Sequence, residues 1–235
     1  MRLLLLSNST NFGEEYLEYP RKEIQYFLGE GVKEVIFIPY AGVTISYDEY
    51  TDRVGKVFEE LGYSLIGIHT CNDPLKAITN AESIAIGGGN TFELLNQLYQ
   101  EELIEPIKVK VHSGIPFMGW SAGSNMACPS IMTTNDMPIA QPPSFTALDL
   151  IPFQINPHYT EGTIPNHGGE SRNMRIEEFL EVNRDMTVVG LTEGMIIKVE
   201  NKQYTLIGEK NAKVFKYGMD SVWVHDDVDF NNAIK

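Results

Sequence analysis

Hydrophobic residues in this chain gather in short runs, and stretches with helical periodicity lie between those runs. The runs alternate little between apolar and polar positions and are rich in Leu, Ile and Val. Such runs are typical of parallel strands that are buried on both faces of a sheet. We therefore predict strands in the first half of the chain at residues 3–6, 35–38, 65–68, 83–86 and 115–120.

Helical spacing separates these strands. Apolar side chains recur on one face over residues 50–61, and Gly62 stands where a helix C-cap is expected. Asp73 and Pro74 have the form of an N-cap followed by a first helical residue, and Thr91 is placed to cap a further helix. The alternation of strand and helix predicts an α/β fold with a mostly parallel, doubly wound sheet flanked by helices.

The rhythm changes after residue 195, where short apolar segments are separated by polar turns. This spacing predicts antiparallel C-terminal hairpins, with strands at 195–200, 203–207, 212–217 and 222–225. Neither a Pro/Ser-rich linker nor an internal repeat interrupts the chain. We therefore predict a single α/β domain over residues 1–235, with the hairpins at one edge.

Composition narrows the range of partners and compartments. The chain has 18 Lys and Arg against 32 Asp and Glu, a net charge of −14. Nucleic acids and anionic membranes attract concentrated Lys and Arg, so we expect neither as a partner. The leucine run near the start is too short for a signal peptide. Cys71 and Cys128 form no Cys-x-x-Cys pair, so disulfides and structural zinc are not expected. A cytoplasmic protein is expected.

The strongest chemical signal is the segment Gly119-Trp120-Ser121-Ala122-Gly123. It follows an apolar strand and opens a segment that can be helical, which is the setting of a nucleophile elbow. A sharp strand-to-helix turn pushes the Ser121 hydroxyl out of the sheet, and the Ala122 N–H is then the natural donor to an oxyanion. The competing interpretation is a glycine-rich turn with an incidental serine.

A serine hydroxyl is a weak nucleophile and needs a base. His158 follows an apolar segment at 151–155 and a proline, so we expect it at the end of a strand, where the sites of open α/β sheets collect. His69 also ends a predicted strand and is the main rival. Each of these histidines can equally be structural or lie on the surface.

An acidic residue should orient the histidine. Asp136, in a polar segment, and Glu193, after a predicted strand at 187–191, are the candidates, while Asp149 is weaker. Spacing does not choose between Asp136 and Glu193. The chain order Ser–His–Glu differs from the Ser–acid–His order of α/β-hydrolases, and Asp136 comes too soon after Ser121 to follow a later strand. An ordinary lipase or esterase is therefore disfavoured.

Two further features suit anionic groups. Gly87-Gly88-Gly89-Asn90 ends a strand and begins a helix, so bare backbone can approach a ligand and supply a second oxyanion donor. The segment lacks the P-loop lysine and the spacing of a nucleotide-binding loop. Arg172 stands near the start of a predicted helix, and an arginine can grip a carboxylate through two hydrogen bonds. A ligand-free turn and a solvated surface arginine are the competing interpretations.

With these residues considered, the sequence resembles the peptidase E family of α-aspartyl dipeptidases over about residues 1–195. Several blocks in the same order carry the resemblance: Leu3-Leu4-Leu5-Leu6-Ser7-Asn8-Ser9-Thr10, Phe37-Ile38-Pro39-Tyr40-Ala41-Gly42-Val43, Asp48-Glu49-Tyr50-Thr51-Asp52, Gly87-Gly88-Gly89-Asn90-Thr91-Phe92, Gly119-Trp120-Ser121-Ala122-Gly123, Thr133-Thr134-Asn135-Asp136-Met137-Pro138, Gln154-Ile155-Asn156-Pro157-His158 and Glu193-Gly194. Ser171 stands where Thr is expected, and the segment 141–144 and the tail match poorly.

The resemblance implies a parallel-sheet α/β sandwich similar to class I glutamine amidotransferases, with serine in place of their nucleophilic cysteine. It implies hydrolysis of dipeptides with an N-terminal aspartate, with a small dipeptide as partner and without a metal or other cofactor. Ser121 would be the nucleophile and His158 the base. Glu193 would orient His158, and Asp136 would be a supporting residue.

The same resemblance implies an oxyanion hole formed by the N–H groups of Gly89 and Ala122. It also implies that Arg172 binds the aspartyl side chain of the substrate. A monomer and a homodimer both fit the sequence. Two alternatives remain: a related serine exopeptidase acting on another aspartyl substrate, similar to cyanophycinase, and a catalytically silent protein that binds small acidic ligands. Substrate profiling and labelling of Ser121 distinguish them.

Overall fold

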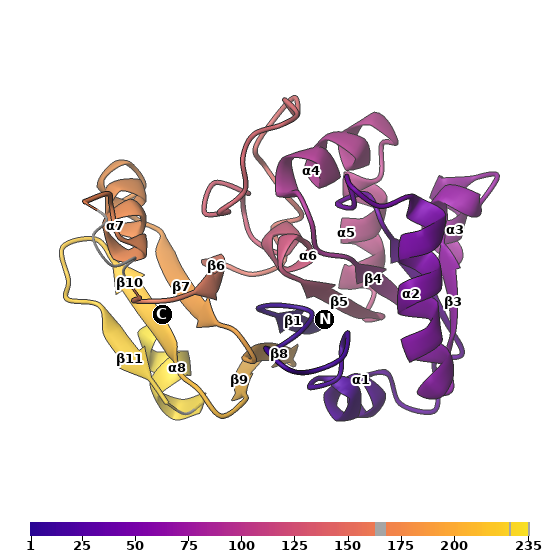
Figure 1. The fold of residues 1–235 in the computed structure, drawn as a ribbon, viewed down its shortest axis with the longest axis horizontal. Coiled ribbons are helices and arrows are strands. Elements are labelled where there is room, and N and C mark those ends of the chain that lie inside the picture. The colour runs from indigo at the N-terminus through magenta and orange to yellow at the C-terminus, as the bar shows by residue number, and fades with distance from the viewer. Residues whose placement is uncertain (163–167, 226, 235) are drawn as a thin grey trace.

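Two β-sheets organise the computed structural model, which describes residues 1–162, 168–225 and 227–234 (Figure 1). In these ranges the larger sheet has seven strands in the order β3-β2-β4-β5-β1-β8-β9, and the smaller sheet has four in the order β11-β10-β7-β6. The same ranges contain no helix with the length and apolar character that crossing a membrane requires.

The larger sheet contains the apolar runs of the first half of the chain. Strands β3, β2, β4, β5 and β1 pair in parallel, whereas β8 and β9 continue the sheet as an antiparallel hairpin. The bounds are β1 (Arg2–Leu6), β2 (Glu34–Ile38), β3 (Ser64–Gly67), β4 (Ile84–Ile86), β5 (Pro116–Trp120), β8 (Ile196–Glu200) and β9 (Gln203–Ile207). The predicted parallel strands are therefore present, and the short helix η1 (Ile68–Thr70) follows β3 directly.

Helices cover both faces of the parallel part of this sheet (Figure 1). On one face, Leu4 and Leu6 pack with side chains of α1 (Arg21–Leu28) and α2 (Tyr47–Glu60). On the other, Leu3 and Leu5 belong to the core formed with α3 (Pro74–Asn80), α4 (Thr91–Gln100), α5 (Ile104–His112) and α6 (Ala122–Met126). Successive strand residues point to opposite faces, so a run of leucines supplies both layers. The predicted doubly wound arrangement is confirmed.

Helix starts follow from local hydrogen bonds. Asp73 caps α3 and Pro74 is its first residue, as predicted. The prediction that Thr91 caps α4 is wrong. Asn90 is the cap, because its Oδ1 accepts from the N–H groups of Phe92 and Glu93 at 3.1 Å, and Thr91 is the first helical residue.

The smaller sheet joins β6 (Gln154–Tyr159), β7 (Thr187–Thr192), β10 (Ala212–Lys216) and β11 (Val222–Val224). It lies to one side of the larger sheet together with α7 (Arg172–Val182) and α8 (Asp227–Ala233) (Figure 1). Strands β6 and β7 are parallel, and β10 is antiparallel to both β7 and β11. The C-terminal antiparallel strands are therefore present, but only β8 and β9 extend the edge of the main sheet. That this arrangement forms one domain stays a prediction.

The strand predicted at 151–155 is misplaced, because β6 begins only at Gln154. Ile151 and Phe153 are buried without belonging to a strand: Phe153 packs edge-on against Tyr204 and Phe230. Burial in a loop therefore explains their apolar character. As a result His158 lies inside β6 rather than after it.

Candidate active site

Ser121 occupies a strained turn between β5 and α6. Its φ of 54° and ψ of −114° are uncommon for a residue with a side chain and cost about 1–3 kcal/mol. A Cβ at Gly119 would overlap the backbone of Gly123, and a Cβ at Gly123 would overlap the backbone of Ile86. Both glycines are thus required where the turn crosses the sheet. The Ser121 N–H donates to Leu6 O at 3.1 Å, which ties the turn to β1.

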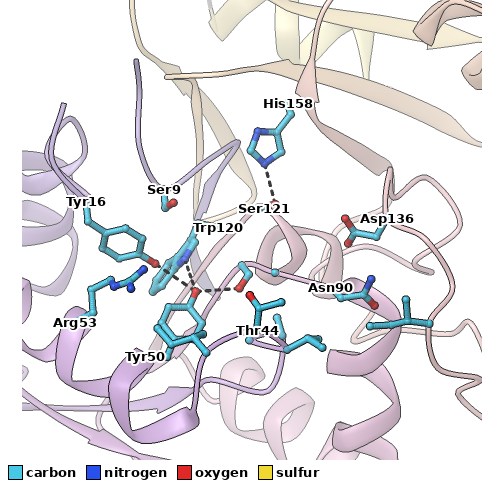
Figure 2. A pocket seen from close by; sticks show the side chains of 17 residues that line it. Ser9, Tyr16, Thr44, Tyr50, Arg53, Asn90, Trp120, Ser121, Asp136 and His158 are labelled. Atoms are coloured by element: carbon cyan, nitrogen blue, oxygen red, sulfur yellow. Dashed lines mark hydrogen bonds between the residues drawn. The ribbon is translucent and has the colours of Figure 1, made fainter. Parts of the chain in front are cut away.

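His158 reaches Ser121 from the neighbouring sheet (Figure 2). Its Nε2 lies 2.9 Å from Ser121 Oγ, and its Nδ1 lies 2.7 Å from Glu193 Oε1. A proton on Nδ1, facing the carboxylate, leaves Nε2 free to accept a proton from the serine. Glu193 therefore contacts His158, and Asp136 does not. His69 lies elsewhere, with its Nε2 3.0 Å from Asp48 Oδ1.

The backbone around His158 is held in an unusual conformation. Its φ is 53°, and the pairing of β6 with β7 shifts register between Asn156 and Tyr159. The His158 N–H donates to the fully buried Ser7 Oγ at 2.9 Å, and that hydroxyl donates to Leu191 O at 2.7 Å. Ser7, at the end of β1, thus connects the two sheets directly behind the histidine.

Asp136 organises the glycine turn rather than the histidine. Its Oδ2 accepts from the Thr91 N–H at 2.7 Å, from Thr91 Oγ1 at 2.5 Å and from Thr134 Oγ1 at 3.1 Å. A carboxylate in this position is favoured by the positive end of α4. Asn90 Nδ2 also donates to Met137 O at 2.9 Å, so hydrogen bonds from both Asn90 and Thr91 join the segment around Asp136 to the start of α4.

A cavity of about 740 Å³ opens over Ser121 (Figure 2). Ser121, His158, Gly88, Gly89 and Asp136 line it, so four of the predicted site residues meet in one place. Neither the Gly89 N–H nor the Ala122 N–H, the predicted oxyanion donors, has a hydrogen-bond partner in the described part of the chain. The same part of the chain holds no group of three His, Cys, Asp or Glu side chains placed to bind a metal ion.

Arg172 is the first residue of α7 and lines a smaller cavity of about 180 Å³, which shares Asp136 with the larger one. It has no hydrogen bond or ion pair with any described residue. Burial, followed by the like charge of Arg175, holds the pKa of Arg172 below its ordinary value. An unpaired, half-buried guanidinium is suited to a carboxylate ligand.

Arg53 is a cavity residue that the sequence reasoning missed. It lines the larger cavity with Ser121, and its guanidinium carbon lies 6.0 Å from the centre of the Tyr16 ring. One signal could have found it. Arg53 stands three residues after the buried Tyr50, so both side chains project from the same side of α2.

Comparison with known proteins gives a consistent result. The model of a family described as peptidase family S51 matches residues 3–207. Peptidase E of Nostoc sp. is 52% identical to this chain over 231 residues, which is 97% of this chain and 96% of that protein. Peptidase E of Salmonella paratyphi A is 50% identical over 222 residues, 94% of this chain and 96% of that protein. The similarity thus extends beyond residue 195, further than the resemblance found in the sequence.

A solved structure supports the fold. The crystal structure of a peptidase from an acI-B1 Actinobacterium matches with a TM-score of 0.67 at 16% identity, over 95% of this chain and 96% of that one. The predicted α/β fold and the predicted family are both confirmed. On the family match and on relatives at about half identity over nearly the whole length, this chain belongs to peptidase family S51.

Proposed function

We propose that this chain is a serine dipeptidase that hydrolyses dipeptides with an N-terminal aspartate through an acyl-enzyme on Ser121. The observation that carries the proposal is the hydrogen-bonded series Ser121 Oγ, His158 Nε2, His158 Nδ1 and Glu193 Oε1, with separations of 2.9 and 2.7 Å. The names of the relatives, peptidase E, support the same class of reaction.

The proposed chemistry is acyl transfer in two steps. His158 Nε2 takes the proton of Ser121 as Oγ attacks the peptide carbonyl, while Glu193 stabilises the positive charge on the ring. The N–H groups of Gly89 and Ala122 receive the oxyanion. The same proton then passes from His158 to the departing amine, and a water molecule activated by His158 releases the aspartate.

Selection of aspartate is assigned to Arg172. Its guanidinium lacks a partner among the described residues and is half removed from water. A neutral side chain in the substrate would leave that charge unpaired, which a site of this kind rejects strongly. We also propose a cytoplasmic location, which is supported by the free thiols of Cys71 and Cys128.

The test is release of free aspartate from Asp-Leu by the purified protein, with Leu-Leu and an extended aspartyl peptide as comparison substrates. The expected result is turnover of Asp-Leu only, and no turnover by Ser121→Ala. Faster cleavage of the extended peptide would replace the dipeptidase by the exopeptidase alternative. Tight binding of Asp-Leu by a folded wild type that never cleaves it would favour the silent binding protein.

A further inference from the structure

A buried tyrosine holds the glycine turn that borders the nucleophile. Tyr50, on α2, is 6% exposed, and its hydroxyl oxygen lies 3.0 Å from Gly88 O. The same oxygen lies 3.2 Å from Nε1 of Trp120, the residue before Ser121, and 3.3 Å from the Tyr16 hydroxyl. Figure 2 shows these contacts converging on the Tyr50 oxygen beneath the serine.

The groups themselves determine the direction of each hydrogen bond. A carbonyl oxygen only accepts and an indole N–H only donates, whereas a phenol carries one proton and two lone pairs. The Tyr50 proton must therefore point at Gly88 O, and both Trp120 and Tyr16 must donate to the Tyr50 oxygen. Burial raises the pKa of Tyr50, so this proton stays bound at neutral pH.

The contact with Tyr50 sets the plane of the peptide bond between Gly88 and Gly89. No peptide bond in the described chain is cis. In a planar trans peptide the C=O and the following N–H point in opposite directions. Holding Gly88 O against Tyr50 therefore turns the Gly89 N–H away from Tyr50. A Cβ at Gly88 would lie 3.1 Å from Ser121 Cβ, so this peptide passes directly beside the nucleophile.

This peptide plane needs such a restraint. The ends of the turn are anchored, because the Gly87 N–H donates to Ile38 O at 3.1 Å and the Asn90 N–H donates to Ala41 O at 2.8 Å. Between them, glycines on both sides permit φ of either sign, so the torsional preferences of residues 88 and 89 do not fix the orientation of the 88–89 peptide. A flipped peptide would present a carbonyl oxygen where an oxyanion needs a donor.

We propose that Tyr50 is a positioning residue: its hydroxyl holds the Gly88–Gly89 peptide in the orientation that presents the Gly89 N–H to the oxyanion formed at Ser121. This inference rests on the proposed function in taking Ser121 as the nucleophile and the Gly89 N–H as an oxyanion donor. Tyr50 acts through the peptide and not on the reacting atoms. Trp120 links the same hydroxyl to the nucleophile turn, so one buried oxygen aligns both sides of the oxyanion site.

The test is Tyr50→Phe, which removes the hydroxyl and keeps the ring. Complete loss of one oxyanion donor lowers the rate by about 10²–10³. A donor that remains present but is no longer held should lower kcat for Asp-Leu by about tenfold to a hundredfold, with KM within about twofold of wild type. Labelling of Ser121 by a fluorophosphonate should slow by the same factor, because its tetrahedral adduct also places an oxygen in the oxyanion site.

Tyr63→Phe is the matched control. Tyr63 is 8% exposed, and its hydroxyl donates to backbone carbonyls at 3.2 Å, but it does not line the cavity over Ser121. Both variants should lower Tm to a similar extent, and only Tyr50→Phe should slow labelling. Placing 4-aminophenylalanine at position 50 restores a donor to Gly88 O and should restore most of the rate.

Three results would overturn the proposal: a folded Tyr50→Phe that is labelled within about twofold of the wild-type rate, equal slowing by Tyr63→Phe, or failure of 4-aminophenylalanine to rescue. If Tyr50→Phe does not fold, a crystal structure of the wild-type phosphonyl adduct decides. An adduct in which the Gly89 N–H donates to the phosphonyl oxygen, while Gly88 O accepts from the Tyr50 hydroxyl, supports the role. An adduct in which Gly88 O is turned away from Tyr50 refutes it. If the wild type is labelled at Ser121 but does not cleave Asp-Leu, only the proposed substrate is contradicted. The labelling rates of the wild type and of Tyr50→Phe then still test the role of Tyr50.

Discussion

Replacing Gly123 with alanine tests the turn that carries Ser121, the proposed nucleophile. A Cβ at Gly123 would lie 2.1 Å from Ile86 O and 2.8 Å from the Ile86 carbonyl carbon. Real Cβ contacts under 3.0 Å essentially never occur, so α6 and β4 must separate by about 0.9 Å at this point. Side-chain rotation cannot relieve this overlap, because the two nearest atoms belong to the backbone of the central sheet.

The shift falls on the reacting pair. Ser121 Oγ and His158 Nε2 are 2.9 Å apart. Asn125 of α6 donates to Ile155 O of β6 at 2.8 Å, but the His158 N–H is anchored to Ser7 Oγ directly after β1, so we expect a movement of α6 away from β4 to change the separation of Ser121 and His158. A misplacement of about 1 Å costs about a hundredfold in rate. Gly123→Ala should therefore lower kcat/KM for Asp-Leu at least a hundredfold, and the overpacking should reduce stability by about 1–3 kcal/mol.

The assay is Asp-Leu hydrolysis with thermal unfolding measured on the same samples. Gly55→Ala, within α2, is the control, because a Cβ there would meet only the Leu65 side chain, at 4.0 Å. This control should keep wild-type activity and gain about 0.5–1 kcal/mol of stability. A folded Gly123→Ala with kcat/KM within about threefold of wild type would show that the position of Ser121 does not depend on a glycine at residue 123.

Three further outcomes are expected. Glu193→Gln removes the charge proposed to stabilise the protonated histidine and should lower kcat at least about a hundredfold. Asp136→Asn weakens the contacts at the start of α4 and should mainly lower Tm. Equal losses of kcat in the two variants would contradict these separate roles. In steady-state kinetics, Arg172→Ala should raise KM for Asp-Leu about tenfold or more, and Arg53→Ala should raise it much less. A larger rise in KM for Arg53→Ala than for Arg172→Ala would place the site for the aspartyl side chain in the larger cavity. Burial raises the pKa of the Cys128 thiol from 9.0 to about 12, so the unfolded chain loses this proton first and stability should fall as pH rises from about 9 to about 12. Ultraviolet absorbance of a Cys128 thiolate in native protein near pH 9, measured in a Cys71→Ser background, would contradict that expectation.

The parallel strands and the nucleophile turn follow from local sequence. Strands buried on both faces must be apolar throughout, and a Cβ at Gly119 would overlap the backbone of Gly123 within the same turn. Gly123 is required by the Ile86 backbone of β4, which local sequence does not show. Helix α5 is harder to predict, because Ile107-Lys108-Val109-Lys110-Val111 alternates like a half-buried strand. In the structure Ile107 and Val111 are buried one helical turn apart, and Val109 is exposed.

The contact between His158 and Glu193 depends on pairing that local pattern does not encode. It requires β6 to lie parallel to β7 with a register shift between Asn156 and Tyr159, the interval that contains the histidine. The buried loop residues Ile151 and Phe153 imitate a strand and displace its expected position. The choice between Asp136 and Glu193 likewise depends on strand pairing, because that pairing brings the Glu193 carboxylate to the His158 ring and leaves Asp136 at the start of α4.

The proposed reaction requires that Ser121 form an acyl-enzyme with the aspartyl group of the substrate. The most direct measurement is mass spectrometry of protein quenched with acid during turnover of Asp-Leu or an activated aspartyl ester. Acyl transfer through Ser121 should add one aspartyl group to the peptide that contains Ser121, and no such gain should occur in Ser121→Ala. Turnover by the wild type with no covalent adduct under any quench, together with full activity of Ser121→Ala, would contradict it.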